Sequence, residues 1–510
     1  MRALIITLAL LAAPALASEV PVEERSIEQL QADLAARRAT SVDLVRAYQA
    51  RIAAMDRKGP MLRSVIALNP DALAQAKALD AERKAGRVRG PLHGVPILIK
   101  DNIETADRVP TTAGSLALAQ NYAAADAPVV AQLRAAGAVI LGKTNLSEWA
   151  NIRSTRSISG WSAVGGQVRN PYALDRTPCG SSSGSGAAVA ASFAAAALGT
   201  ETDGSVVCPS SINGLVGLKP TKGLVPGERI VPISHSQDTA GPMARSVRDA
   251  ALLLGAMAGR DFTAGLSASA LSGLRIGVVR PENLTPDLAA RYDQALDQLK
   301  AAGAVLVDVA VPKAEGVGEA ELLVLKTELK ADLNAYLATT PAAVRTRTLA
   351  DVIAFNQANA AAEMPYFGQE LFEQAQQTKG LADPAYRAAR AKSLRLTGAE
   401  GIDAMLAQAK ATVLVEPTYG PAWLIEPVYG DQYGGPSSSE RPAISGYPNL
   451  TVPMGLVRGL PVGLSFIATK GGDATVLNAG YAYEQRARAR VAPRYLPTAD
   501  VGPGADGAPR

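Results

Sequence analysis

The segments TPCGSSSGSGA (residues 177–187) and LGTETDGS (residues 198–205) are two serine- and glycine-rich stretches joined by an apolar run. Glycine lacks a Cβ, so the backbone can approach a ligand there, and consecutive loop N–H groups can converge on a developing oxyanion. Such clusters are more often flexible linkers. A linker, however, would not continue into the alanine- and valine-rich, helix-like run 187–198 and then into a second glycine turn before VVCP at 206–209. The pattern therefore indicates a site for a nucleophilic serine.

One lysine, Lys100, ends the apolar run of GVPILIKDN (residues 94–102). Serine alone is a poor nucleophile, and lysine can serve as its base only where burial or neighbouring groups keep the amine neutral. A strand over residues 95–99 would carry Lys100 into the interior among hydroxyl groups. A lone strand-end lysine is usually solvated and charged. Its combination with two serine loops favours a buried base.

Further segments accompany these motifs: AVILGKTNLSE (138–148), GLVGLKPT (214–221), DTAGPMARS (238–246), GYPNLTVPMG (446–455) and LPVGL (460–464). Together the segments resemble the amidase signature family over most of the chain. The resemblance implies a Ser-cisSer-Lys triad: Lys100 as base, Ser181 as bridging serine in a cis peptide after Gly180, and Ser205 as nucleophile. The backbone N–H groups that it implies for the oxyanion hole are those of Thr202, Asp203, Gly204 and Ser205.

Several positions depart from the common family pattern. Asp203 precedes Gly204 where many members have a second glycine, Cys179 and Ser183 replace common glycines, and Val207 stands where relatives often carry arginine. These departures make the sequence most similar to the bacterial peptide amidases, which remove the C-terminal amide of peptides. We expect Asp203 to shape the pocket and to repel a free C-terminal carboxylate.

Hydrophobic periodicity predicts the fold class. Residues 26–55 have helical spacing, with Ser41 as a cap for a second helix, and residues 126–136 predict a helix that leads into a strand at 138–141. Strands alternate with helices up to about residue 310, which argues for an α/β fold with a large mixed β-sheet covered by helices on both faces. The resemblance implies the amidase signature fold as a single domain.

A change of pattern occurs between about residues 312 and 436. Ala/Leu-rich helices dominate there, most clearly at 319–337 and 385–409. We expect this segment to form a helical cover over the site and to set substrate choice.

The N-terminus has the pattern of a signal peptide. Arg2 precedes an apolar run at residues 4–13, and Ala15-Leu16-Ala17 has the small-x-small pattern of signal peptidase sites. The run is too short for a permanent membrane anchor. We therefore expect residues 1–17 to be removed, the amidase domain to span 18–497, and the protein to be exported to the periplasm or medium. The Gly-, Pro-, Ala- and Asp-rich residues 498–510 predict a disordered tail.

Composition excludes some partners. With 48% hydrophobic and 19% charged residues, the chain can form a large core. A net charge of +4 over 510 residues is too dilute for a nucleic-acid-binding surface. We expect a monomer that binds a small-molecule or peptide amide and needs no metal or organic cofactor.

Two rival chemistries use the histidines, His93 and His235. One rival is a Ser-His-Asp triad that uses His235 and Asp238. A metal site lacks Cys-x-x-Cys or His-x-x-x-His spacing. The two cysteines, Cys179 and Cys208, flank the two serine loops, and a disulfide between them is left open.

The sequence thus predicts a serine hydrolase of carboxylic amides that deamidates the C-terminus of peptides. A broader aryl, fatty or cyclic amide or ester hydrolase is the alternative enzyme. A tRNA-dependent amidotransferase subunit conflicts with the signal segment and the dilute charge. A non-catalytic binding protein on the same scaffold conflicts with the intact Lys100, Ser181 and Ser205.

Overall fold

The strands that carry the predicted site are buried on both faces. The structure, a computed structural model, describes residues 20–499. Every residue of β2 (Pro96–Lys100), β3 (Val139–Thr144) and β4 (Ala196–Glu201) is buried. Successive side chains of a strand point to opposite faces, so continuous burial means that both faces of the sheet are covered. This explains why these strands do not alternate between apolar and polar residues.

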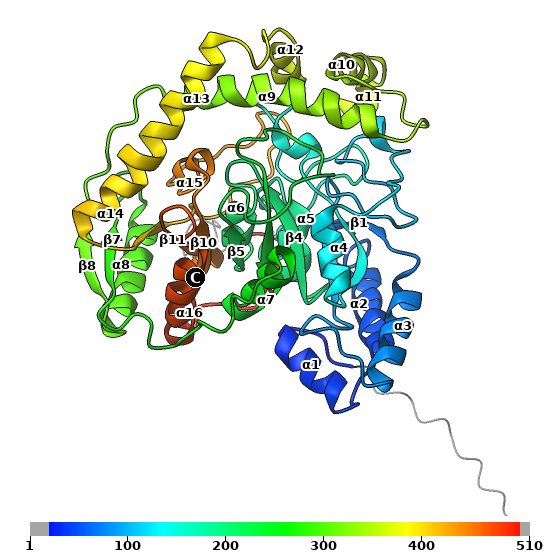
Figure 1. The fold of residues 1–510 in the computed structure, drawn as a ribbon, viewed down its shortest axis with the longest axis horizontal. Coiled ribbons are helices and arrows are strands. Elements are labelled where there is room, and N and C mark those ends of the chain that lie inside the picture. Colours follow the sequence, from blue (N-terminus) through cyan, green and yellow to red (C-terminus); the bar gives the residue numbers. More distant parts are fainter. Residues whose placement is uncertain (1–19, 500–510) are drawn as a thin grey trace, which may run out of the picture.

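Within residues 20–499, one mixed sheet contains eleven strands (Figure 1). β2 pairs in parallel with both β3 and β4, whereas β4 pairs antiparallel with the next strand, β6. In spatial order the strands are β1 (Val65–Leu68), β3, β2, β4, β6 (Thr239–Ala244), β5 (Val216–Lys219), β10 (Asn449–Val457), β11 (Leu460–Ile467), β9 (Val413–Pro417), β7 (Arg275–Val278) and β8 (Val305–Asp308). The expected α/β fold with a large mixed sheet in one domain is confirmed.

Most helices outside the predicted cover lie beside the sheet or at its β1 edge (Figure 1). These helices are α1 (Ile27–Ala35), α2 (Ser41–Met55), α3 (Ala72–Lys84), α4 (Pro128–Ala135), α5 (Ser183–Ala190), α6 (Val207–Ile212), α7 (Val247–Ala258), α8 (Pro286–Ala301), α15 (Glu440–Ser445) and α16 (Asp473–Ala487). Among the residues described, no helix has the length and apolar character needed to cross a membrane.

A second group of helices forms an arc along one side of the molecule, the yellow-green to yellow ribbons of Figure 1. Its members are α9 (Val317–Thr339), α10 (Leu349–Ala358), α11 (Ala360–Glu363), α12 (Glu370–Gln376), α13 (Pro384–Thr397) and α14 (Ala404–Ala409). A π-helical turn at Gly398–Asp403 joins α13 to α14. The helices of this group end at Ala409, and β9 then follows in the main sheet.

Two local expectations were wrong. Thr40, rather than Ser41, caps α2: its hydroxyl accepts the Asp43 N–H, and the Asp43 side chain accepts the Thr40 N–H. The run 187–198 is not one helix, because α5 ends at Ala190 and β4 begins at Ala196. Alanine favours helix, but the place of β4 between β2 and β6 overrides that weak preference.

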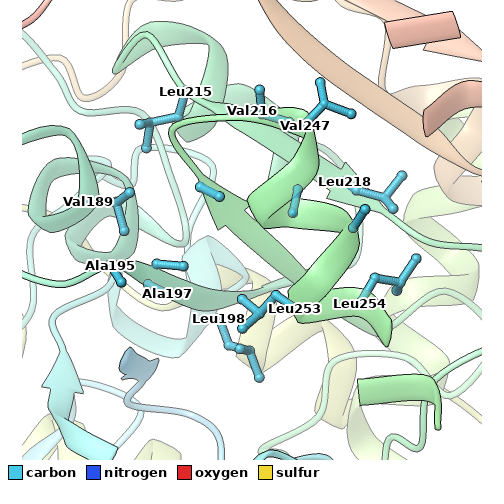
Figure 2. Close-up of a cluster of buried hydrophobic side chains, with 14 of the residues drawn as sticks. Val189, Ala195, Ala197, Leu198, Leu215, Val216, Leu218, Val247, Leu253 and Leu254 are labelled. Carbon is cyan, nitrogen blue, oxygen red and sulfur yellow. The ribbon is translucent and has the colours of Figure 1, made fainter. Parts of the chain in front are cut away.

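The main core lies around these central strands. Figure 2 shows side chains of α7 (Val247, Leu253 and Leu254) near Leu198 of β4 and Leu218 of β5, all of them buried. The core holds β4 and β5 in place, and both serine loops are anchored on β4 or on helices packed against it. The expected signal peptide (1–17) and residues 500–510 of the expected tail lie outside the described residues.

Candidate active site

Lys100 is the last residue of β2 and is completely buried. Its Nζ lies 2.8 Å from Ser181 Oγ and 2.8 Å from Thr200 Oγ1, and 3.3 Å from the Thr200 carbonyl oxygen. Asn102 donates to the same Thr200 hydroxyl at 3.0 Å. The predicted base thus touches the predicted bridging serine, and Thr200 and Asn102 orient it.

Burial lowers the pKa of Lys100 to about 7, although the charges of Asp238 and Glu201 act in the opposite direction. An ammonium group loses its hydration in the interior, whereas a neutral amine loses much less. About half of the Lys100 amines are therefore neutral at pH 7. The site contains a base that can accept a proton at neutral pH.

Ser181 lies in the turn before α5, and the Gly180–Ser181 peptide bond is cis, as the resemblance implied. A Cβ at position 180 would overlap Ser147 Oγ, so this position requires glycine. The Ser181 carbonyl oxygen accepts the Ser147 N–H at 3.1 Å. These contacts hold the fully buried Ser181 with its hydroxyl against Lys100.

Ser205 lies in the turn between β4 and α6. Its carbonyl oxygen accepts the Ser182 N–H at 3.2 Å, so the two serine loops are in contact through their backbones. Ser205 is 8% exposed, whereas Lys100 and Ser181 are 0% exposed. The predicted nucleophile is the one member of this group that solvent reaches, which suits a group that must meet a substrate.

The turn that contains Ser205 is held by a residue that the sequence analysis did not assign. Glu201 Oε2 accepts the N–H groups of Val206 at 2.8 Å and Val207 at 2.9 Å. Burial raises the pKa of Glu201, while Lys219 and the N–H groups of Val207, Val206 and Gly204 lower it. The Gly204 N–H therefore faces Glu201. Among the four N–H groups expected in the oxyanion hole, that of Gly204 thus has Glu201 as a partner within the protein.

Asp203 faces other acidic groups. Burial raises its pKa above the usual value for aspartate, as do Glu201 and Glu440, while a hydrogen bond with Ser439 lowers it. Burial, followed by the Asp203 charge, also raises the pKa of Glu321. Asp203 is therefore less charged near neutral pH than an exposed aspartate. Its expected repulsion of a free carboxylate is weaker than the sequence alone suggested.

Cys179 and Cys208 form a disulfide. The sequence alone had left this pairing open. The bond is buried beside Ile212 and Ala422. Cys179 precedes Ser181 by two residues, and Cys208 lies in α6, three residues after Ser205. The bond therefore joins the first serine loop covalently to the helix that follows the second.

The histidines have other partners than the rival triad requires. His93 is buried, with Nε2 2.9 Å from the Leu79 carbonyl oxygen. The His235 ring faces Asp332, at 2.9 Å, and not Asp238. The Asp238 carboxylate instead accepts the Thr202 hydroxyl at 2.6 Å. The contacts therefore give no support to a Ser-His-Asp triad.

Within residues 20–499, one side-chain cluster has the composition of a metal site: His235, Glu328 and Asp332, with ligand atoms within 4.8 Å of one another. Both Glu328 oxygens already accept hydrogen bonds, from the Ser236 hydroxyl at 2.9 Å and the Tyr386 hydroxyl at 2.7 Å. Both carboxylate oxygens of Glu328 thus already have hydrogen-bond partners in the protein, and Glu328 lies on α9 rather than in the serine loops.

A cavity of about 660 Å³ lies between the strand ends near Lys100 and helix α9. Asn102, Thr200 and Thr202 line one part of it, and Ile230, Asp332 and other residues line the remainder.

The irregular segment after β9 reaches the loop that contains Ser205. A Cβ at Gly204 would overlap the Tyr419 hydroxyl. Tyr433 packs against both Tyr419 and Trp423, with ring centroids 5.3 Å apart in each pair. This aromatic group was not predicted, because it lies more than 200 residues from Ser205 in sequence.

Comparison with known proteins identifies the family. The amidase family model matches residues 43–477. The chain belongs to the amidase family. A probable amidase of Arabidopsis thaliana is 36% identical over 507 residues, which cover 94% of this chain and 93% of that protein. The family resemblance seen in the sequence is confirmed.

Two further similar proteins are informative. The native peptide amidase of Stenotrophomonas maltophilia superposes with a TM-score of 0.89 at 52% identity, covering 93% of this chain and 99% of that chain. A glutamyl-tRNA(Gln) amidotransferase subunit of Halorhodospira halophila is 35% identical, covering 91% of this chain and 97% of that protein. The chain is thus similar over most of its length both to a peptide amidase and to an amidotransferase subunit.

Proposed function

We propose that this protein is a serine amidase that converts the C-terminal amide of a peptide to the free acid and ammonia. The observation that supports the proposal most directly is the buried Lys100. Its Nζ lies 2.8 Å from Ser181 Oγ and its pKa is about 7, so it suits the role of base for Ser205. The 52% identity to a peptide amidase supports the substrate class.

In the acylation step, Ser205 Oγ attacks the carbonyl carbon of the amide. Its proton passes to Ser181 Oγ, and the Ser181 proton passes to the neutral Nζ of Lys100. The carbonyl π electrons move to the oxygen, and the N–H groups of Thr202, Asp203 and Ser205 stabilise that oxyanion. The exposure of the three side chains fits this order, since the proton moves from the accessible Ser205 to the buried Lys100.

Collapse of the tetrahedral intermediate reverses the proton path. The Lys100 ammonium returns a proton through Ser181 to the leaving nitrogen, the C–N bond breaks, and ammonia leaves. Water then attacks the acyl group on Ser205 with the same residues as base and relay. Each step uses groups of this chain and water, so the mechanism calls for no cofactor.

The test is hydrolysis of a dipeptide amide followed by chromatography and ammonia detection. We expect one ammonia for each dipeptide acid, with the internal peptide bond intact. Ser205→Ala protein is the matched control. Internal cleavage, or faster hydrolysis of long-chain fatty amides than of peptide amides, would replace the proposal with the broader amide hydrolase.

We further propose that the protein is exported and is a monomer that binds peptide amides in the aqueous phase. The support for export is the signal-peptide pattern of residues 1–17. Mass spectrometry of protein from the native host tests export and should find Ser18 at the N-terminus. Light scattering tests the oligomeric state and should give the mass of one chain. A mature protein that begins at Met1 would contradict export.

A further inference from the structure

Helix α9 contacts one short segment of chain, residues 234–238, through three acidic side chains. Glu321, Glu328 and Asp332 are spaced by seven and four residues, which places them on one face of the helix. Glu321 accepts the Gln237 amide at 2.8 Å. The other two carboxylates accept the backbone N–H of Ser236 at 3.2 Å and that of His235 at 2.7 Å.

The same segment also contacts the oxyanion loop. Gln237 Nε2 donates to the Thr202 carbonyl oxygen at 3.2 Å as well as to Glu321. The amide therefore uses both of its hydrogens, and the side chain is buried. Asp238 accepts the Thr202 hydroxyl at 2.6 Å. Thr202 is thus held at its carbonyl and at its side chain by adjacent residues of one segment.

The contact at the Thr202 carbonyl determines the direction of the next N–H group. A trans peptide unit is planar, and its C=O and N–H point in opposite directions. The bond from Gln237 to the Thr202 oxygen therefore also orients the Asp203 N–H. This N–H is one of the three assigned to the oxyanion.

We propose that Gln237 is a positioning residue that aims the Asp203 N–H into the oxyanion hole and ties its direction to Glu321 of helix α9. The inference rests on the proposed function, because it concerns the oxyanion formed in amide hydrolysis. It gives the α9 cover a role in catalysis without contact between α9 and the reacting atoms.

Glu321 suits this role because burial and the nearby Asp203 raise its pKa, which keeps its carboxyl largely neutral. A neutral carboxyl still offers a carbonyl oxygen to Gln237. Glu321→Gln should therefore keep the contact, whereas Glu321→Met should remove it with little change in volume.

The principal variant is Gln237→Met, which keeps the length of the side chain but removes both N–H donors. We expect kcat on a dipeptide amide to fall about 10- to 100-fold with KM changed less than about 3-fold, because loss of an entire oxyanion donor costs about 100- to 1000-fold. The affinity for a peptide aldehyde should fall by a similar factor. In that complex Ser205 Oγ bonds to the aldehyde carbon, the hydroxyl proton moves through Ser181 to Lys100, and the new oxyanion occupies the hole. Affinity for the product acid should be unchanged.

Ser236→Ala is the matched control, since it removes one hydroxyl from the same segment and does not touch Thr202. Its kcat should stay within about 2-fold of wild type. An unchanged kcat in Gln237→Met, or equal losses of affinity for the aldehyde and the product acid, would overturn the inference. Thermal melting shows whether Gln237→Met folds. If it does not, Glu321→Met is compared with Glu321→Gln, and we expect kcat to be about 3- to 10-fold lower for Glu321→Met alone. Equal kcat values for the two Glu321 variants would overturn the inference.

Failure of the proposed function has a different signature. The wild type would then prefer another amide to the dipeptide amide, and the same ratios would be measured on that substrate. The oxyanion forms in any serine-catalysed amide hydrolysis, so the role of Gln237 is tested in either case.

Discussion

The acid limb of the pH–rate profile tests the central argument that Lys100 works as a neutral amine. Burial lowers its pKa from 10.5 to about 7. At pH 7 about one half of the Lys100 amines are unprotonated, against about one in 3000 for a lysine with an ordinary pKa. The structure therefore supplies roughly a thousandfold more of the working base at neutral pH.

The perturbation is pH, and the assay is kcat/KM for a dipeptide amide from pH 5 to pH 9 at constant ionic strength. We expect kcat/KM to level off above pH 8 and to fall about tenfold per unit below pH 6, with an apparent pKa near 7. Between pH 7 and pH 5 the neutral fraction falls from about one half to about one hundredth, so activity should drop about 50-fold. Thermal melting at each pH separates this loss from unfolding.

A variant at Asp238 tests a charge that opposes the shift. The Asp238 charge raises the pKa of Lys100, so Asp238→Asn should lower that pKa and move the acid limb to lower pH. Asparagine retains a carbonyl oxygen for the Thr202 hydroxyl. A wild-type profile that is flat from pH 5 to pH 8, or that still rises steeply at pH 9, would refute the assignment of Lys100 as the base.

Three further predictions follow from the site. Ser205→Ala should abolish turnover while the protein melts near the wild-type temperature, and its loss should be far from additive with that of Ser181→Ala; near-wild-type activity would remove Ser205 from the nucleophile role. Replacing Cys179 and Cys208 together by alanine should lower the free energy of unfolding by about 3–4 kcal/mol, since the bond closes a loop with a sequence separation of 29 residues. Denaturant titration measures this, and an unchanged midpoint would contradict it. Activity should persist in EDTA, and loss with recovery on added zinc would overturn the mechanism.

Local sequence was sufficient to identify the parts of the site that depend on a short motif. The apolar run before Lys100 predicts a buried strand, and the structure places the lysine at the end of β2. The glycines beside Ser181 and Ser205 mark positions where a Cβ would collide with a neighbour, as at Gly180 and Gly204. These requirements act within a few residues, so they are visible in the sequence.

Tertiary structure decided which groups support those residues. Thr200, Glu201 and Gln237 occur in or near the motifs, but nothing in their spacing shows that they contact Lys100, the Ser205 turn and the Thr202 carbonyl, respectively. The alanine-rich β4 illustrates the same limit, because its neighbours β2 and β6, rather than its own composition, make it a strand.

The sequence by itself therefore determined the chemical groups: a lysine that a strand carries inward and two serines in glycine turns. The tertiary structure determined their state, including the lowered pKa of Lys100, the disulfide between Cys179 and Cys208, and the link from α9 through Gln237 to Thr202. The physical reason is that a pKa and a hydrogen bond depend on what lies within a few ångströms of a group. In this fold, residues from distant parts of the chain, such as Lys100, Ser181 and Thr200, supply those neighbours.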